Sequence, residues 1–354
     1  MRSIKFKIKY LILGGLLILL IVARIMAPTI ILSKTNDYLS SFSENYTGHV
    51  GDFDLSLWRG AYFFKNIELA LKTDATKPFA TVKVVEVSIA WSQIFYGRIV
   101  TDVIANEVVI VVDRAFTTVK KNKSKSAEDA KNVKSKFFPV TTEKIEIRNS
   151  RIEDLELNLF ADQIEGRLSH VTATPENPLS ILTLRGLLLG KTPLKIASTL
   201  NLTEDPVAWV FAAEVQKLNL VDTNFFTKRY IPITFKSGIL DIFSEIKSEN
   251  GKISGYVKPF LKDGVIFGDD KDFESIKHFG IELTVAALNL FFRSNNKHVV
   301  ATRVLFTYNE GQFEWNQSEA FTELFKNGYQ QQLNPGLENL LTLSKKSYKD
   351  GTNK

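Results

Sequence analysis

Apolar side chains recur at every second residue in one segment after another from residue 50 onward. In VAWVFAAEV, for example, Val207, Trp209, Phe211 and Val215 fall on one face of an extended chain. A period of two is typical of β-strands, whose successive side chains point to opposite faces. Helical periods are rare in the same region. The pattern therefore predicts a mainly β fold of roughly a dozen strands, mostly antiparallel because their connections are short.

Two turn signals predict which strands pair. Asn250-Gly251 supplies the two positive φ angles of a type I′ turn, so the strands around 240–246 and 253–257 should form a hairpin. The segment LLLGKTPLKI, with Gly190 and Pro193, is a second hairpin candidate. Both signals lie between alternating segments, as expected for neighbouring antiparallel strands.

The predicted strands have one apolar face each and few helices to cover it. Such strands close as a sandwich or barrel, or curl into an open groove with an apolar interior. Alternation alone favours neither, because a closed core and an open groove require the same pattern. In either case the apolar face is predicted to carry Val85, Val87, Ile89, Trp91, Leu194, Ile196, Leu200, Leu202, Val207, Trp209, Phe211, Val215, Val304 and Phe306.

The N-terminus combines four cations in its first nine residues with an apolar run from Leu11 to Ala23. If Arg24 reaches the headgroups, the run extends to Leu32, and a helix needs about 20 residues to cross the hydrocarbon core. A cleaved signal peptide is the alternative, but the bulky Ile25 occupies a position where cleavage requires a small residue. We therefore predict an uncleaved single-pass anchor with a cytoplasmic N-terminus, which places the bulk of the chain in the periplasm of a double-membraned bacterium.

Two further helices are predicted outside the anchor. The segment 30–46, IILSKTNDYLSSFSENY, would continue the anchor as a stalk. The segment 319–333, EAFTELFKNGYQQQL, spaces Phe321, Leu324 and Phe325 as one face of an amphipathic helix. Its apolar face lacks flanking cations, so the helix is expected to pack on the sheet as a lid.

The positive charge of the chain is concentrated in two segments. Residues 1–33 and 114–136 hold thirteen of the 45 basic side chains and two of the 39 acidic ones, so the rest of the chain is mildly acidic. We therefore expect no nucleic-acid partner, because a basic groove for nucleic acid must neutralise many phosphates. The lysine-rich run from Lys120 to Lys136 has no aromatic residues for base stacking, and we predict a flexible charged linker over residues 114–138.

Motifs for chemistry are missing from the sequence. The chain has no cysteine, its four histidines are scattered, and no phosphate-binding glycine loop or nucleophile elbow occurs. We therefore expect no catalytic residues, metal site or cofactor, and no enzyme activity.

Several segments together resemble bacterial AsmA-like proteins, the inner-membrane-anchored relatives of TamB. The likeness begins with GDFDLSLWRGAYFFKNIELALK and PFATVKVVEVSIAWSQIFYGRIVTDVIANEVVIVV, and continues in FPVTTEKIEIRNSRIEDLEL. The later segments GILDIFSEIKSENGKISGYVKP and ATRVLFTYNEGQFEWNQSEAFTELFKNGYQQQLNPGLENL are similar to the branch that carries a domain of unknown function. One departure is Asn106-Glu107, where the family often has a proline at a strand edge.

The resemblance implies a repeating β-groove fold related to bridge-like lipid transfer proteins. The expected fold is an N-terminal transmembrane helix, an elongated, curved antiparallel sheet that forms a groove, and a C-terminal amphipathic helix. The corresponding regions are an anchor at 1–33, a first β segment at 34–113, the linker at 114–138, the continued groove at 139–316, and the helix with a polar tail at 317–354.

The implied function is binding of phospholipid acyl chains in the groove, in support of lipid transport or outer-membrane and envelope maintenance. Membrane phospholipid is the expected partner, with envelope proteins or self-association in addition. The alternative is a closed β-sandwich that acts as a scaffold or assembly factor for envelope proteins.

Overall fold

The structure is a computed structural model in which most of the chain is described. It describes residues 2–56, 59–113, 140–171, 179–202, 204, 206–230, 234–267, 299–309, 311–315, 322 and 333–343. The predicted linker at 114–138 and nearly all of the predicted C-terminal helix lie outside these residues. Both therefore stay predictions.

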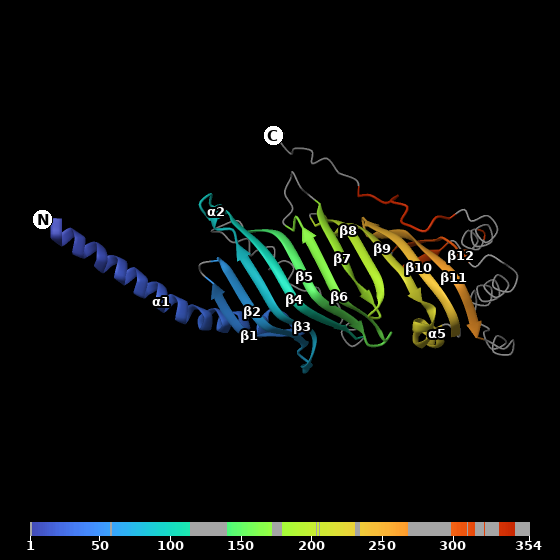
Figure 1. Ribbon diagram of the computed structural model, residues 1–354, viewed down its shortest axis with the longest axis horizontal. Coiled ribbons are helices and arrows are strands. Elements are labelled where there is room, and N and C mark those ends of the chain that lie inside the picture. Colours follow the sequence, from blue (N-terminus) through green and yellow to red (C-terminus); the bar gives the residue numbers. More distant parts are fainter. Residues whose placement is uncertain are drawn as a thin grey trace, which may run out of the picture. The chain divides into compact units, whose positions relative to one another are not determined.

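Fourteen strands occur in the described residues, and they form one antiparallel sheet (Figure 1). The hydrogen-bonded order follows the chain from β1 to β11 and continues with β13 and β14, while β12 also pairs with β11. This confirms the predicted mainly β, antiparallel fold. The strands are β1 (Tyr46–Ser56), β2 (Ala61–Leu71), β3 (Asp74–Ile89), β4 (Ile99–Val112), β5 (Val140–Asp154), β6 (Leu159–Ser169), β7 (Ser180–Leu188), β8 (Thr192–Asn201), β9 (Ala208–Asn219), β10 (Thr234–Glu249), β11 (Lys252–Phe267), β12 (Val299–Ala301), β13 (Val304–Asn309) and β14 (Gln312–Trp315).

The chain divides into two compact units, which we call unit 1 (Met1–Ser150) and unit 2 (Arg151–Lys354). The division falls inside β5. Short helices accompany the strands: α2 (Trp91–Ile94) in unit 1, and a 3-10 turn, η1 (Leu220–Thr223), followed by α5 (Asn224–Tyr230) in unit 2.

Both predicted hairpins are present in unit 2. Strand β10 pairs with β11 around the turn at Asn250 and Gly251, whose φ angles are 53° and 78°. Strand β7 pairs with β8 around Leu189 and Gly190, with φ angles of 53° and 74°. Two successive positive φ angles define the type I′ geometry that matches the twist of the flanking strands.

Helix α1 (Arg2–Ser41) joins the predicted anchor and stalk into one helix that continues through Pro28. It ends at Ser41, before the predicted stalk end at residue 46, because β1 begins at Tyr46. Among the described residues, no helix has both the length and the apolar character needed to span a bilayer. Most side chains of the run from Leu11 to Ala23 are not described, so the anchor stays a prediction.

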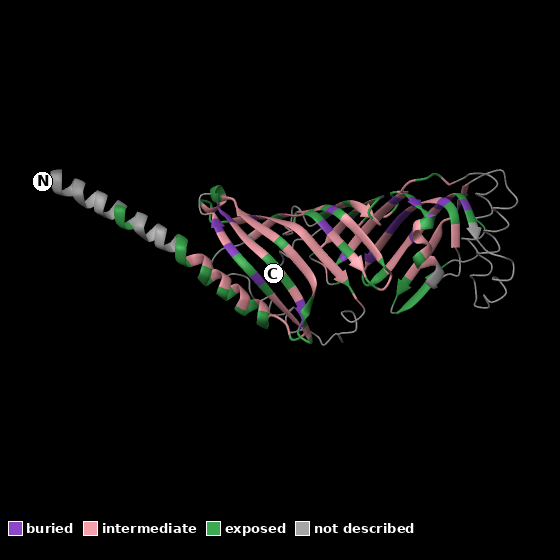
Figure 2. Cartoon of the chain, turned by 60° about the horizontal axis from the view of Figure 1, so that its bottom comes forward, coloured by how far each residue is buried: buried purple, intermediate pink, exposed green. Residues whose placement is uncertain are grey.

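Most strand residues are neither fully buried nor fully exposed (Figure 2). Fully buried apolar side chains are few and fall mainly in β1 and β2 of unit 1 and in β9 to β11 of unit 2. In a two-layer fold, by contrast, one face of each strand is buried against the other layer. Within the described residues, the strands therefore have the burial expected of a single sheet.

Beta bulges keep the apolar side chains of unit 2 on one face. Val215 of β9 pairs with Ile242 of β10, and Leu218 pairs with Leu240. Ile242 and Leu240 are two residues apart and therefore share a face. Val215 and Leu218 share it as well, although three positions separate them. The additional residue is accommodated at Lys217, whose φ is 62°. Register shifts next to a positive φ also occur at Gln163 in β6 and Asp263 in β11.

Helix α1 covers the free edge of β1 in unit 1. The side-chain amide of Asn36 donates to the carbonyl oxygen of Val50 at 3.0 Å, and its oxygen accepts the Val50 N–H at 2.7 Å. Leu39 lies against Gly48, where a Cβ atom would stand 3.3 Å from that of Leu39. An edge strand exposes unpaired backbone groups that can pair with another chain. Asn36 blocks this edge by occupying both groups of Val50.

Substitution of Asn36 by alanine should therefore loosen α1 from β1. Val50 is 2% exposed, so its N–H and C=O would lose their partners in a buried place, at a cost of about 1–3 kcal/mol. Urea denaturation followed by tryptophan fluorescence measures the change. Asn36→Asp is the matched control, because it keeps the acceptor for the N–H and loses only the donor. Equal stability of the alanine variant and the parent would contradict the edge-cover role.

Candidate functional site

The predicted apolar residues of β8 and β9 lie side by side on one face of unit 2. Leu194 is directly opposite Val215, and Leu200 is directly opposite Trp209. Residues that face each other in an antiparallel pair project to the same side of the sheet. Ile196 and Phe211 follow by alternation within the same strands. Six of the predicted residues thus share one face.

This face continues across β10, β11 and β13. Phe211 is opposite Ile246 of β10, Ile246 is opposite Gly255 of β11, and Gly255 is opposite Phe306 of β13. Phe306 is in turn opposite Trp315 of β14. A neighbouring row contains Ile196, Ala213, Ser244, Val257 and Val304. Register therefore brings residues more than one hundred positions apart in sequence onto one surface, which we call the unit 2 apolar face.

Unit 1 has an apolar face of its own on β1 to β4. Val85 is opposite Phe64, and Val87 is opposite Tyr62. The ring of Phe53 on β1 lies 4.8 Å from that of Phe64 between centroids. Ile89 on β3 and Val103 and Ala105 on β4 lie on the same face. We call these residues together the unit 1 apolar face.

Three predicted residues do not lie on a strand face. Trp91 begins α2 and its indole packs over Gly60, where a Cβ atom would stand 2.5 Å from the indole Nε1. Leu202 and Val207 lie in the connection between β8 and β9, and both are 39% exposed. The prediction was wrong here because apolar alternation runs past the ends of the strands into their turns.

The eleven remaining predicted residues are in strands. Val215 is the one among them that is buried, with 9% of its surface exposed. The side chains of Trp209, Phe211 and Phe306 are all half-buried. In an interior core, large aromatic side chains are nearly fully covered. The half-buried state means that these rings contact neighbours on the sheet and still offer surface to a ligand.

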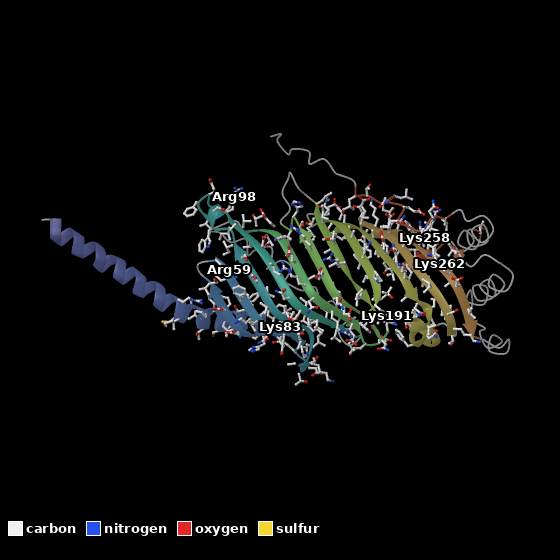
Figure 3. All side chains as sticks on the ribbon, in the orientation of Figure 1. Arg59, Lys83, Arg98, Lys191, Lys258 and Lys262 are labelled. Carbon is white, nitrogen blue, oxygen red and sulfur yellow. The ribbon has the colours of Figure 1, made fainter. Side chains whose placement is uncertain are left out.

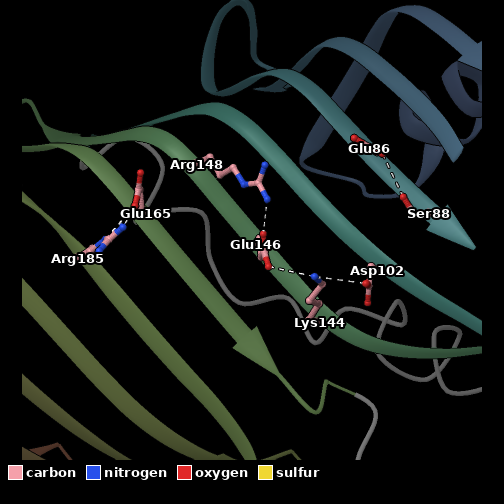
Figure 4. Close-up of polar contacts among 8 residues, drawn as sticks. All are labelled: Glu86, Ser88, Asp102, Lys144, Glu146, Arg148, Glu165 and Arg185. Atoms are coloured by element: carbon pink, nitrogen blue, oxygen red, sulfur yellow. Dashed lines mark hydrogen bonds and ion pairs between the residues drawn. The ribbon is translucent and has the colours of Figure 1, made fainter. Parts of the chain in front are cut away.

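The opposite face of the sheet carries fixed charges. In unit 1, Lys144 lies 3.5 Å from Asp102 and 3.3 Å from Glu146, and Arg148 lies 2.7 Å from Glu146 (Figure 4). The hydrogen bond from Arg148, with a smaller contribution from Lys144, lowers the pKa of Glu146. Asp102 precedes Val103 in β4, so it projects away from the unit 1 apolar face.

Unit 2 repeats this separation. Arg185 of β7 forms an ion pair with Glu165 of β6 (Figure 4). Lys195 is opposite Arg185 on one side and Glu214 on the other, in the row next to Leu194 and Val215. Across β6 to β9, one face of the sheet is thus apolar and the other is charged.

One part of the charged face in unit 2 is covered. Residues 333–343, which we call the strap, lie over β10 and β11, where Leu333 and Leu337 pack on the buried cluster of Phe243, Phe260 and Ala301. The sequence analysis missed this cluster, because Phe243 and Phe260 occupy the positions between the alternating apolar residues. The sequence feature that could have predicted the cluster is that β10 and β11 carry apolar residues on both faces.

A buried polar network fixes the strap. Glu245 is 3% exposed and accepts the backbone N–H groups of Asn339 and Leu340 at 2.9 and 3.3 Å. The Tyr256 hydroxyl accepts the Glu338 N–H at 2.9 Å. Burial, and the hydrogen bond to Glu245, raise the pKa of Tyr256, so its hydroxyl stays protonated. A cleft of about 650 Å³ lies beside the strap and is lined by Leu305, Thr307, Glu314, Leu341 and neighbouring residues.

Sequence reasoning also missed members of the two apolar faces. Leu182 and Leu184 on β7, Ile242 on β10 and Ile253 on β11 belong to the unit 2 apolar face by register. Tyr62 and Phe64 belong to the unit 1 apolar face. Each stands in an alternating segment, so the same period of two could have found them.

Comparisons with known protein families and curated proteins gave no match. No family description matches the chain. A search of curated proteins also gives no match. The resemblance to AsmA-like proteins therefore rests on the sequence segments themselves and stays a proposal.

Proposed function

We propose that this protein holds phospholipid acyl chains on the apolar faces of its sheet, as an AsmA-like protein of the bacterial inner membrane. Its role would be lipid transport or maintenance of the outer membrane and envelope. Helix α1 would anchor it as a single pass with a cytoplasmic N-terminus, and the strands of both units would lie in the periplasm. No reactive side chain takes part in this function.

The observation that carries the proposal is the unit 2 apolar face. Its large side chains lie in adjacent rows on one sheet and are half-buried, while the neighbouring positions in the same strands carry Lys195, Glu214 and Lys247. A contiguous apolar face of this kind is typical of a binding site for an apolar partner. Acyl chains match it, because they need apolar contact and no hydrogen bonds.

Transfer of an acyl chain from water onto such a face is favourable by about 0.8 kcal/mol for each CH₂ group that is fully buried. A half-covered CH₂ gains proportionally less. The affinity of an acyl chain therefore rises with the number of rows of apolar side chains that it contacts. The headgroup stays in water at a rim of the sheet. The polar Ser244 and Ser248 interrupt the rows without adding a charge, so they do not exclude an acyl chain.

A closed scaffold remains the second interpretation of the sequence, with envelope proteins or a second copy as the partner. It requires Trp209, Phe211 and Phe306 to be enclosed by protein. Their half-buried state in the described structure supports the lipid-binding proposal instead.

Photocrosslinking in cells tests the proposal. A benzophenone amino acid at position 211 would lie on the unit 2 apolar face, and the same residue at position 210 would point to the opposite face beside Thr199 and Lys247. We expect a phospholipid adduct at 211 and little or none at 210, detected by mass spectrometry of the full chain. Adducts of equal yield at both positions, or only protein adducts at 211, would refute lipid binding on this face.

A further inference from the structure

A rim of unit 1 displays exposed aromatic side chains next to arginines. Phe95 is 88% exposed and Tyr96 is 76% exposed, both in the loop that follows α2. Trp91, at the start of α2, is 46% exposed. Arg98 ends the same loop, and Arg59 lies in the preceding turn between β1 and β2 (Figure 3). We call these five residues the aromatic rim.

The loop is held in a defined shape. Backbone hydrogen bonds join Gln93 to Ala90 at 3.0 Å, Tyr96 to Gln93 at 3.0 Å, and Gly97 to Ile94 at 2.9 Å. Gly97 has a φ of 69°, which turns the chain back toward β4. The loop therefore projects Phe95 and Tyr96 outward from a fixed backbone. Exposure of two large rings from an ordered turn is costly in water unless the rings meet a partner.

The α2 loop and the β1–β2 turn lie at the same end of the strands. Ile89, the last residue of β3, donates its N–H to the carbonyl oxygen of Gly60 at 2.8 Å. The indole of Trp91 covers the same glycine. Arg59 lies next to Gly60 in the chain, so the arginine and the aromatic residues belong to one rim.

Helix α1 runs along β1 toward this rim. Asn36 contacts Val50, and Arg24 lies 3.4 Å from Asp54. Positions decrease along α1 as they increase along β1, so the helix runs antiparallel to the strand. The part of α1 before Arg24 therefore continues toward the end of the sheet at which β1 ends (Figure 1). This is the part that carries the apolar run predicted to cross the membrane.

The charges of the rim match phospholipid headgroups. The Arg98 guanidinium donates to the neutral Gln93 Oε1 at 3.0 Å, and within the described residues no carboxylate neutralises it. Arg59 pairs with Glu86 at 3.1 Å but keeps most of its surface in solvent, with 66% of the side chain exposed. Aromatic side chains with a polar edge collect at membrane interfaces, and guanidinium groups bind phosphate in two-point contacts.

We propose that the aromatic rim docks on the surface of a phospholipid membrane. Phe95 and Tyr96 insert among the headgroups and Arg98 binds a lipid phosphate. The orientation rests on the proposed anchor in α1, and the contact would place one end of the unit 1 apolar face at the bilayer from which acyl chains would enter. The docking is a separate property from acyl-chain binding on the faces.

Single-cysteine labelling tests the docking on the full chain, which contains no cysteine of its own. Phe95→Cys and, as the matched control, Thr73→Cys would each carry an environment-sensitive fluorophore. Thr73 is exposed in the β2–β3 turn, at the opposite end of β2. The labelled chains are reconstituted into vesicles of equal parts phosphatidylethanolamine and phosphatidylglycerol that contain a nitroxide quencher near the headgroups.

We expect a blue-shifted emission and several-fold stronger quenching for the label at 95 than for the label at 73. Tyr96→Ser or Arg98→Gln, each combined with the label at 95, should reduce the quenching. Equal quenching at 95 and 73, or failure of the chain to associate with the vesicles, would overturn the docking proposal. The lipid adduct at position 211 is measured separately. If the adduct forms but the label at 95 is not quenched, the docking proposal fails alone; if the label is quenched but no adduct forms, acyl-chain binding fails alone.

Discussion

A Trp209→Asp variant should lose lipid and keep its fold. The indole lies on the unit 2 apolar face opposite Leu200 and Ser248, and a carboxylate in its place would withdraw contact from roughly three or four CH₂ groups of a bound acyl chain. At about 0.8 kcal/mol for a fully buried group, and about half of that for a half-covered one, this costs about 1–3 kcal/mol, or roughly a 5- to 150-fold loss of affinity. The readout is the yield of lipid adduct from the benzophenone at position 211.

Val210→Asp is the matched control, since it introduces the same charge one residue away on the opposite face. It should change the adduct yield little, because its neighbours there are Thr199 and Lys247. Circular dichroism and urea denaturation establish whether each variant folds. An unfolded Trp209→Asp chain would favour the closed scaffold, because a buried, unpaired carboxylate is strongly destabilising in a core.

The second large effect is expected at the strap. Lys258 has a side chain only 4% exposed, and its ammonium lies 3.3 Å from Glu338. Arg303 lies 3.1 Å from the other oxygen of the same carboxylate. Glu338→Ala removes this carboxylate and leaves the Lys258 charge in a buried place without it. Removal of one partner of a buried ion pair costs about 3–5 kcal/mol, so unit 2 should unfold at a clearly lower urea concentration.

A double variant distinguishes the effect of the buried charge on stability from the effect of lost packing. Lys258→Met combined with Glu338→Leu removes the buried charge and fills similar volume with apolar groups, which is often neutral for stability. We expect it to recover most of the loss caused by Glu338→Ala. If the double variant is as unstable as the single one, the strap is held by its backbone hydrogen bonds to Glu245 and not by the ion pair.

The fold class, both hairpins and most of the unit 2 apolar face follow from local sequence. The turn at Asn250 and Gly251 needs only the conformational freedom of two adjacent residues, so it is visible in a dipeptide. Strand faces follow from a period of two, and register then brings Leu194 to Val215 without any further signal. These features depend on neighbours in the chain, which a sequence displays directly.

Other features depend on contacts that the sequence does not display. Glu245 and Glu338 belong to one network although more than ninety residues separate them. Trp91 continues the alternation of β3, yet the chain turns into α2 after Ile89 and places the indole over Gly60. The apolar positions of β2 change phase between Phe64 and Ile67, where Asn66 has a φ of 52°. Such a shift depends on how the strand pairs with its neighbours, not on the residue alone.

The strand order has a consequence for how this chain is made. From β1 to β11, each strand is hydrogen-bonded to the strand synthesised just before it. Every new strand up to β11 is therefore made after the strand with which it pairs, and most of the connections that have to close are short, the long stretch of residues 113–139 between β4 and β5 excepted. A chain of this kind can fold progressively from its N-terminus while the remainder is still being translated or exported. Addition of a hairpin would lengthen the sheet without disturbing earlier strands, much as repeats extend a solenoid.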